Sequence, residues 1–236
     1  MSLIKMPGFE RSLKVFSAGA VAPPLQKAVA IFQKRSSVAC DIRIGKPSVL
    51  LAEIVEAKQG DLICCGAEYM LDEAVDAGTV VGDSRRSLGT RQSALIVPKG
   101  NPAGILTLED LCRPGIRIGI ATEGCLKGLW DDIASRAGLA DEVRRNIVRR
   151  ADSCGAVMAL VNTKAVDAIF GWSAFAKIWP ETSEAVELPR DLQVFRSTVA
   201  GIVSYSRESE LARRLLEFLS SKDADSVYRD YGWVRK

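Results

Sequence analysis

Residues 15–34, VFSAGAVAPPLQKAVAIFQK, decide the fold because they predict a buried strand that turns directly into an amphipathic helix. Gly19 permits a tight bend and a close approach of a ligand to the backbone. Pro23 and Pro24 suit the first turn of a helix, where a missing N–H group is harmless. A strand that passes through small residues into a helix leaves several N–H groups in a crevice, and such groups attract anions. We therefore interpret residues 17–24 as one part of a binding site.

The composition favours a binding protein over an enzyme. The 236 residues are 47% hydrophobic and 26% charged, and this length allows two lobes of about 100 residues each. The net charge of +3 gives no indication of a nucleic-acid partner. The chain contains no histidine, which excludes Ser-His and Cys-His nucleophile pairs and HExxH metal sites. We expect no enzyme activity, no cofactor and no metal ion.

Short apolar runs alternate with helical patterns along the chain, which is typical of an α/β fold with mostly parallel sheets. The strands are predicted near 13–16, 41–44, 61–65, 93–97, 116–120, 166–170 and 198–205. The helices are predicted at 68–77, 126–137, 141–149, 210–221 and 223–231, besides those that begin near 23, 48 and 155. Strand-to-helix turns recur at 17–24, 45–48, 121–126 and 152–155.

Ser48 follows the second of these turns and can cap a helix. The apolar residues of that helix are expected to be Val49, Leu51, Ile54 and Val55, which follow helical spacing. A ligand contact and a plain N-cap are equally good interpretations of Ser48.

Basic residues near the turns have two interpretations. Lys46 and Lys127 lie beside two turns and could steer an anion inward, although a solvated surface lysine is the commoner case. The arginines of the predicted helix 141–149 suggest phosphate binding, but a solvated helix face explains them better.

The order of the predicted elements indicates two lobes. Residues 11–95 and 199–236 are assigned to the first lobe, 96–198 to the second, and 1–10 to an N-terminal extension. The strands near 93–97 and 197–204 would then form a two-strand hinge on which the lobes close and exclude water.

Several segments, taken in order, resemble the molybdate-type substrate-binding proteins of ABC transporters, which have the type II periplasmic-binding-protein fold. They are VFSAGAVAPPL (15–25), SVLLAEIVEAKQGDLICCGAE (48–68), ALIVPKGNP (94–102), TEGCLKG (122–128), AVMALVNTKAVDAIFGWSAF (156–175) and DSVYRDYGW (225–233). The resemblance implies a periplasmic or membrane-tethered receptor that holds a tetrahedral oxyanion in the cleft between its lobes. It also implies an ABC permease as partner, and we expect a monomer.

The resemblance also implies which positions contact the ligand. They correspond here to Ser17, Gly19, Ala20, Pro47, Ser48, Cys125, Leu126, Ser153, Cys154, Gly171 and Trp172. Ala20 and Pro47 stand where the family has serines, so two hydroxyl donors are lost or displaced. The contacts near 125–126 and 153–154 are mainly backbone contacts in the family. The tyrosine that donates a hydroxyl in the family corresponds to residues 171–172 here. Trp172 either donates its indole N–H group to the ligand or only forms an apolar side of the binding site.

Cys125 and Cys154 fall at two of these turns, where they could lie near one another. Three interpretations stay open: a thiol-sensitive pocket, a disulfide, or two inert small residues. The six cysteines form no CxxC pair, and most of them are interpreted as buried small hydrophobic residues.

The sequence therefore predicts an extracytoplasmic receptor for an anion, with molybdate or tungstate first and a small organic anion second. Residues 1–10 lack the apolar run of a signal peptide, so we expect a native leader to be missing from this sequence. Membrane association is expected only through the transporter or a lipid anchor. The alternative is the effector-sensing domain of a transcriptional regulator, which has the same two-lobe layout. No DNA-binding helix-turn-helix precedes residue 13, and this counts against the alternative.

Overall fold

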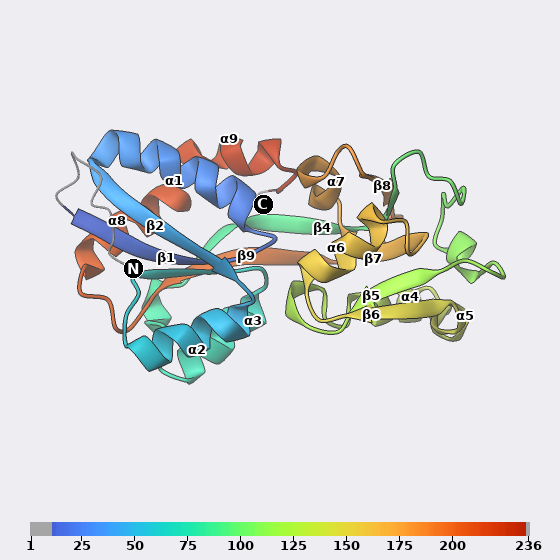
Figure 1. The fold of residues 1–236 in the computed structure, drawn as a ribbon, viewed down its shortest axis with the longest axis horizontal. Coiled ribbons are helices and arrows are strands. Elements are labelled where there is room, and N and C mark those ends of the chain that lie inside the picture. The colour runs from blue at the N-terminus through green and yellow to red at the C-terminus, as the bar shows by residue number, and fades with distance from the viewer. Residues whose placement is uncertain (1–10, 235–236) are drawn as a thin grey trace. The chain divides into compact units, whose positions relative to one another are not determined.

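The computed structural model describes residues 11–234 and contains two compact units of α/β structure (Figure 1). The first unit comprises residues 11–89 and 198–228, and the second comprises 90–197 and 229–234. The chain therefore passes between the units within the strands β4 (Arg86–Pro98) and β9 (Phe195–Ile202), and again after Tyr228. The predicted N-terminal extension lies outside the described residues.

The units differ from the predicted lobes at their edges. Residues 90–95 and 229–234 belong to the second unit, whereas the prediction assigned them to the first lobe. The C-terminal residues join the second unit because Thr90 and Val234 exchange backbone hydrogen bonds of 2.7 Å. The ring of Trp233 also lies against Arg91 of the same unit.

The sheet of the first unit is built on the strand that opens the chain. β1 (Arg11–Ala18) pairs in parallel with β2 (Val38–Gly45) and β3 (Leu62–Cys65), and β9 runs antiparallel to β3. Figure 1 shows α1 on one face of this sheet and α2 and α3 on the other. The helical segments of this unit are α1 (Ala22–Ser36), α2 (Pro47–Ala57), α3 (Glu68–Asp76), the 3-10 turn η1 (Gly82–Ser84), α8 (Ser209–Leu219) and most of α9 (Lys222–Asp230).

The opening strand and helix bury the residues that the sequence pattern predicts. Leu13 and Val15 on β1 and Leu25, Val29 and Phe32 on α1 are all buried. The three helix positions follow the i, i+4, i+7 spacing of one helix face. This face packs on the sheet and so fixes where the turn between β1 and α1 lies.

The sheet of the second unit mixes both strand directions. β5 (Ile118–Ala121) pairs in parallel with β6 (Ile147–Ala151) and β7 (Ala168–Trp172), while β4 pairs antiparallel with β7 and β8 (Ser183–Glu187). β8 was not predicted. The helical segments are η2 (Glu109–Cys112), η3 (Gly124–Leu126), α4 (Leu129–Arg136), α5 (Ala140–Arg145), α6 (Cys154–Asn162) and α7 (Ala174–Ile178).

Two helices of the second unit are shorter than predicted. The helix predicted at 141–149 ends at Arg145, because the following residues pair with β5 as β6. The side chain of Asn146 donates to the carbonyls of Leu111 and Arg113 and so holds the chain at this transition. The helix predicted at 126–137 begins at Leu129, because Gly128 adopts a left-handed φ of 74°.

Of the apolar positions predicted for α2, Ile54 is buried, but Val49 and Val55 are not. Leu50 and Ile54 are fully buried, whereas Val49 and Val55 are 47% and 45% exposed. The helix is apolar on several sides, so spacing alone does not identify the side that packs on the sheet.

Candidate functional site

The turn between β1 and α1 offers fewer amide donors than the sequence predicts. The Val21 N–H group donates to the Ala18 carbonyl at 3.0 Å, and the Ala22 N–H group donates to the Gly19 carbonyl at 3.3 Å. The next two residues are prolines, which have no N–H group. Four of the residues in this turn therefore offer no free amide, and the expectation of several amide donors rests on Gly19 and Ala20 alone.

The three residues expected to contact ligand in this turn differ in exposure. Ser17 is fully buried, and its hydroxyl donates to the carbonyl of Ala18 at 3.1 Å. Ala20 is buried, whereas Gly19 is exposed. A Cβ atom added at Gly19 would meet nothing within 4 Å, so the packing leaves open space there.

The start of α2 presents two amides and a hydroxyl. Pro47 is the first helical residue, Lys46 is the N-cap, and the Leu50 N–H group already donates to the Lys46 carbonyl at 3.0 Å. The amides of Ser48 and Val49 have no acceptor within the helix. Ser48 is exposed and is the second helical residue, so the prediction that it caps the helix is wrong. Amides and a hydroxyl at a helix start suit an oxyanion.

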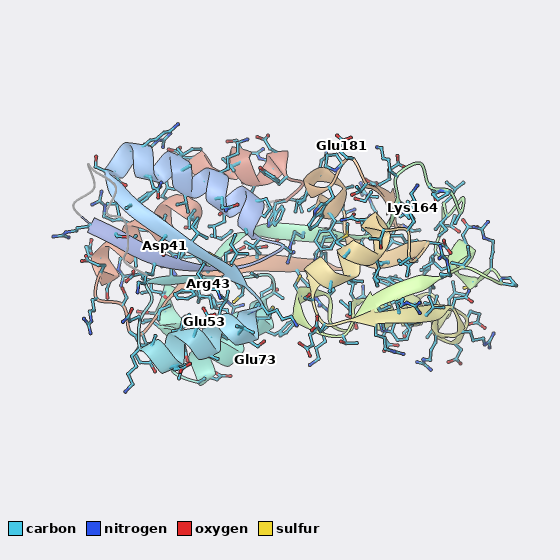
Figure 2. All side chains as sticks on the ribbon, in the orientation of Figure 1. Asp41, Arg43, Glu53, Glu73, Lys164 and Glu181 are labelled. Atoms are coloured by element: carbon cyan, nitrogen blue, oxygen red, sulfur yellow. The ribbon has the colours of Figure 1, made fainter. Side chains whose placement is uncertain are left out.

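An ion pair connects α2 with the strand before it. The Arg43 guanidinium on β2 lies 2.8 Å from the Glu53 carboxylate in α2, and Figure 2 labels both residues. The hydrogen bond from Arg43 lowers the pKa of Glu53. The pair lies on the surface and therefore adds little stability, but it links the two elements that flank the turn.

The start of α6 presents a second pair of amides. Ser153 is the N-cap, and its Oγ atom accepts a hydrogen bond of 3.2 Å from the Ala156 N–H group. The predicted helix start is confirmed. The amides of Cys154 and Gly155 have no acceptor within the helix, and Gly155 is exposed.

Cys125 and Leu126 lie in η3 and are buried. Arg196 on β9 holds this segment, because its guanidinium donates to the carbonyls of Cys125 and Lys127 at 2.9 and 3.0 Å. The same guanidinium lies 3.2 Å from Asp132 on α4. Arg196 therefore positions a turn that the sequence predicted only as a helix start.

A buried cluster surrounds the sulfur of Cys125. This Sγ atom lies 3.0 Å from Sγ of Cys154, 3.3 Å from Nε1 of Trp172 and 3.6 Å from Nη1 of Arg91. The Arg91 guanidinium stacks over the rings of Trp172 and Trp233, 4.9 and 5.5 Å from the ring centroids. Cys125 is 3% exposed and Cys154 is 9% exposed. Two donors and the sulfur of Cys154, from three different segments, thus converge on one sulfur.

These donors favour the thiolate form of Cys125. The hydrogen bond from Cys154, the positive charge of Arg91 and the indole N–H group of Trp172 lower the pKa of Cys125 to about 5, although burial opposes them. The shared hydrogen bond and burial raise the pKa of Cys154. The two opposite shifts favour the thiolate on Cys125 and the thiol on Cys154.

Gly171 and Trp172 lie within β7, not after it as predicted. A Cβ atom at Gly171 would lie 2.8 Å from Ile96 Cγ1, so this glycine allows close packing. Trp172 is fully buried, and its indole N–H group donates a hydrogen bond to the sulfur of Cys125.

The sequence did not single out Arg91 or Arg196. One signal could have found Arg91, namely its place just before an apolar run, since a charged residue inside a strand is rarely buried without a specific role.

Among residues 11–234, no helix is long and apolar enough to cross a membrane, and no group of three or more Cys, Asp or Glu side chains could hold a metal ion.

Comparisons with known proteins identify relatives over nearly the whole chain. A sequence model described as a bacterial extracellular solute-binding protein matches residues 13–234. YvgL of Bacillus subtilis (strain 168), which carries the name of an ABC transporter substrate-binding lipoprotein, is 24% identical over 192 residues, covering 80% of this chain and 73% of YvgL.

Two solved structures show the fold. PEB3 of Campylobacter jejuni with L-phospholactate bound has a TM-score of 0.83 and 22% identity, covering 95% of this chain and 100% of PEB3. The periplasmic molybdate-binding protein of Azotobacter vinelandii has a TM-score of 0.77 and 20% identity, covering 95% of this chain and 99% of that one. The predicted α/β fold of the type II periplasmic binding proteins is thus confirmed.

The matched sequence model covers almost every described residue, and its description agrees with the predicted extracytoplasmic location and with binding rather than catalysis. It favours the receptor over the regulator domain. This chain belongs to the family of bacterial extracellular solute-binding proteins.

Proposed function

We propose that this protein captures a small oxyanion outside the cytoplasm and delivers it to the permease of an ABC transporter. The observation that carries the proposal is that α2 and α6 each begin with two amides that have no acceptor within the helix. The name of YvgL supports the transporter partner.

The amides at these helix starts can hold an anion without a fixed counter-charge. A helix start carries roughly half a positive charge, and each hydrogen bond to an ionised acceptor contributes roughly 1.5–3 kcal/mol. Ser48 adds a hydroxyl donor at the start of α2. Neutral donors that are already oriented therefore suffice for an oxyanion.

Molybdate or tungstate is the first candidate ligand, in line with the similarity to the molybdate-binding protein of Azotobacter vinelandii. Two features favour a second candidate, a phosphorylated carboxylic acid. The hydroxyls missing at Ala20 and Pro47 would weaken a small tetrahedral oxyanion by about 2–6 kcal/mol if nothing replaced them. The solved structure of PEB3 contains L-phospholactate, which is such an acid.

Isothermal titration calorimetry tests the proposal. Molybdate, tungstate, sulfate, phosphate and L-phospholactate are titrated into the parent protein and into Ser48→Ala. We expect one of these anions to bind, and we expect Ser48→Ala to weaken it roughly tenfold through the loss of one donor.

The matched control is Ser209→Ala, which removes a hydroxyl from the first residue of α8, where it donates to the Ser206 carbonyl. This variant should bind like the parent. Binding of none of the five anions would refute the oxyanion proposal. An equal loss in both serine variants would show that Ser48 does not contact the ligand.

A further inference from the structure

Cys125 and Cys154 have the geometry of a dithiol that can be oxidised. Their Sγ atoms are 3.0 Å apart, so about 1 Å of approach would bring them to the length of a disulfide bond. They come from η3 and from the first residue of α6, and each segment is held separately. By contrast, the neighbours Cys64 and Cys65 point to opposite faces of β3.

The two sulfurs have unequal roles. The Trp172 indole and the Arg91 guanidinium donate to Cys125, which favours this sulfur as the thiolate and therefore as the nucleophile. With the thiolate on Cys125, the proton between the two sulfurs stays on Cys154, whose sulfur lies 3.0 Å away and is in place to resolve a mixed disulfide on Cys125.

We propose that Cys125 and Cys154 form a redox-active pair that a small-molecule disulfide converts to an intramolecular disulfide, and that Arg91 and Trp172 keep this disulfide easy to reduce. The second part follows because both donors stabilise the thiolate, which exists only in the reduced protein. A dithiol whose reduced form is stabilised gives a labile disulfide rather than a structural one. The side chains involved all belong to the second unit, and the exchange requires no bound anion.

The reaction is two successive thiol–disulfide exchanges. The Cys125 thiolate attacks one sulfur of the small disulfide, forms a mixed disulfide and releases one small thiolate. Cys154 then loses its proton to solvent, and its sulfur attacks Sγ of Cys125 and displaces the second small thiolate. In sum, two cysteines are oxidised to one disulfide and the reagent is reduced to two thiols.

Equilibration of the whole protein in mixtures of reduced and oxidised glutathione tests the proposal. After acid quenching and alkylation, peptide mass spectrometry measures the fraction of Cys125–Cys154 disulfide. We expect this disulfide to form in the parent and to disappear when the proportion of reduced glutathione is raised. Absence of the disulfide in fully oxidised glutathione would overturn the proposal.

Two tryptophan variants test the role of the donors. Trp172→Phe removes a hydrogen bond to the thiolate. The ratio of reduced to oxidised glutathione at which half of the disulfide is reduced should therefore rise roughly tenfold. Trp233→Phe alters the other ring that stacks on Arg91 and should shift the midpoint much less. Equal shifts in both variants would overturn the role of Trp172.

A measurement on the reduced parent guards against misfolding of the Trp172 variant. The thiolate absorbs in the ultraviolet, and its absorbance is taken as the difference between the parent and Cys125→Ser. This difference should be present at neutral pH and should disappear as the pH is lowered through the pKa of about 5. A difference that appears only above neutral pH would show that Cys125 is an ordinary thiol.

Discussion

Replacing Gly155 by proline tests the amides at the start of α6 directly. The change deletes one of the two N–H groups that have no acceptor within the helix. A Cβ atom at Gly155 would meet nothing within 4 Å, so the packing leaves room for a side chain. The chain already uses prolines in the first turn of α1, and the first turn of a helix tolerates them.

The expected loss is that of one hydrogen bond to an anion. Such a bond contributes roughly 1.5–3 kcal/mol, which corresponds to a dissociation constant raised about ten- to hundredfold. Gly155→Ala is the matched control, because it fills the same space and keeps the amide. It should bind within about twofold of the parent, a difference below 1 kcal/mol.

Calorimetry with the anion that binds the parent most tightly measures both variants, and urea unfolding checks that both are folded. Binding by Gly155→Pro at the strength of the parent would refute the role of this amide. An equal loss in Gly155→Ala would assign the effect to the added side chain.

Two further predictions concern the stability of the second unit. Gly171→Ala places a methyl group 2.8 Å from Ile96 Cγ1 and 3.1 Å from Phe175 Cδ2, so urea denaturation should show a free energy of unfolding lowered by about 1–3 kcal/mol, and an unchanged value would contradict this packing. Burial opposes ionisation of Asp167, but the hydrogen bonds and charge of Arg117 outweigh it and lower the pKa of Asp167. The stabilisation by this carboxylate is therefore present above its ordinary pKa and is lost as the pH falls through the lowered one. Asp167→Asn should unfold more easily than the parent at neutral pH and like the parent in strong acid, and an equal difference at both pH values would refute the pairing.

The fold could be predicted from the sequence wherever local pattern and packing agree. Leu25, Val29 and Phe32 form one helix face, and the strand before them is continuously apolar, so both elements were predicted correctly. The hydrophobic pattern gave a wrong prediction where a segment distant in the sequence determines the secondary structure. The residues after Arg145 form β6 because β5 offers them a partner, and the side chain of Asn146 bonds to carbonyls more than thirty residues earlier.

The candidate site was predictable only in part. The strand-to-helix turns located the starts of α2 and α6 to within a residue or two, because capping and small residues leave a local signal. The only local signal of Arg91 is its place before an apolar run, and this does not show its partners, because they are two tryptophans far along the chain. The sequence could therefore suggest that Cys125 and Cys154 are neighbours, but not that one is a thiolate.

The amide signals of Ser48 and Gly155, followed by NMR during titration with the tightest-binding anion, test the central claim most directly. If a helix start binds the anion, the amide signal at the start of α2 or of α6 shifts during the titration and saturates with the affinity measured by calorimetry. Anion binding by calorimetry with neither signal moved would contradict the claim that the amides of a helix start bind the anion.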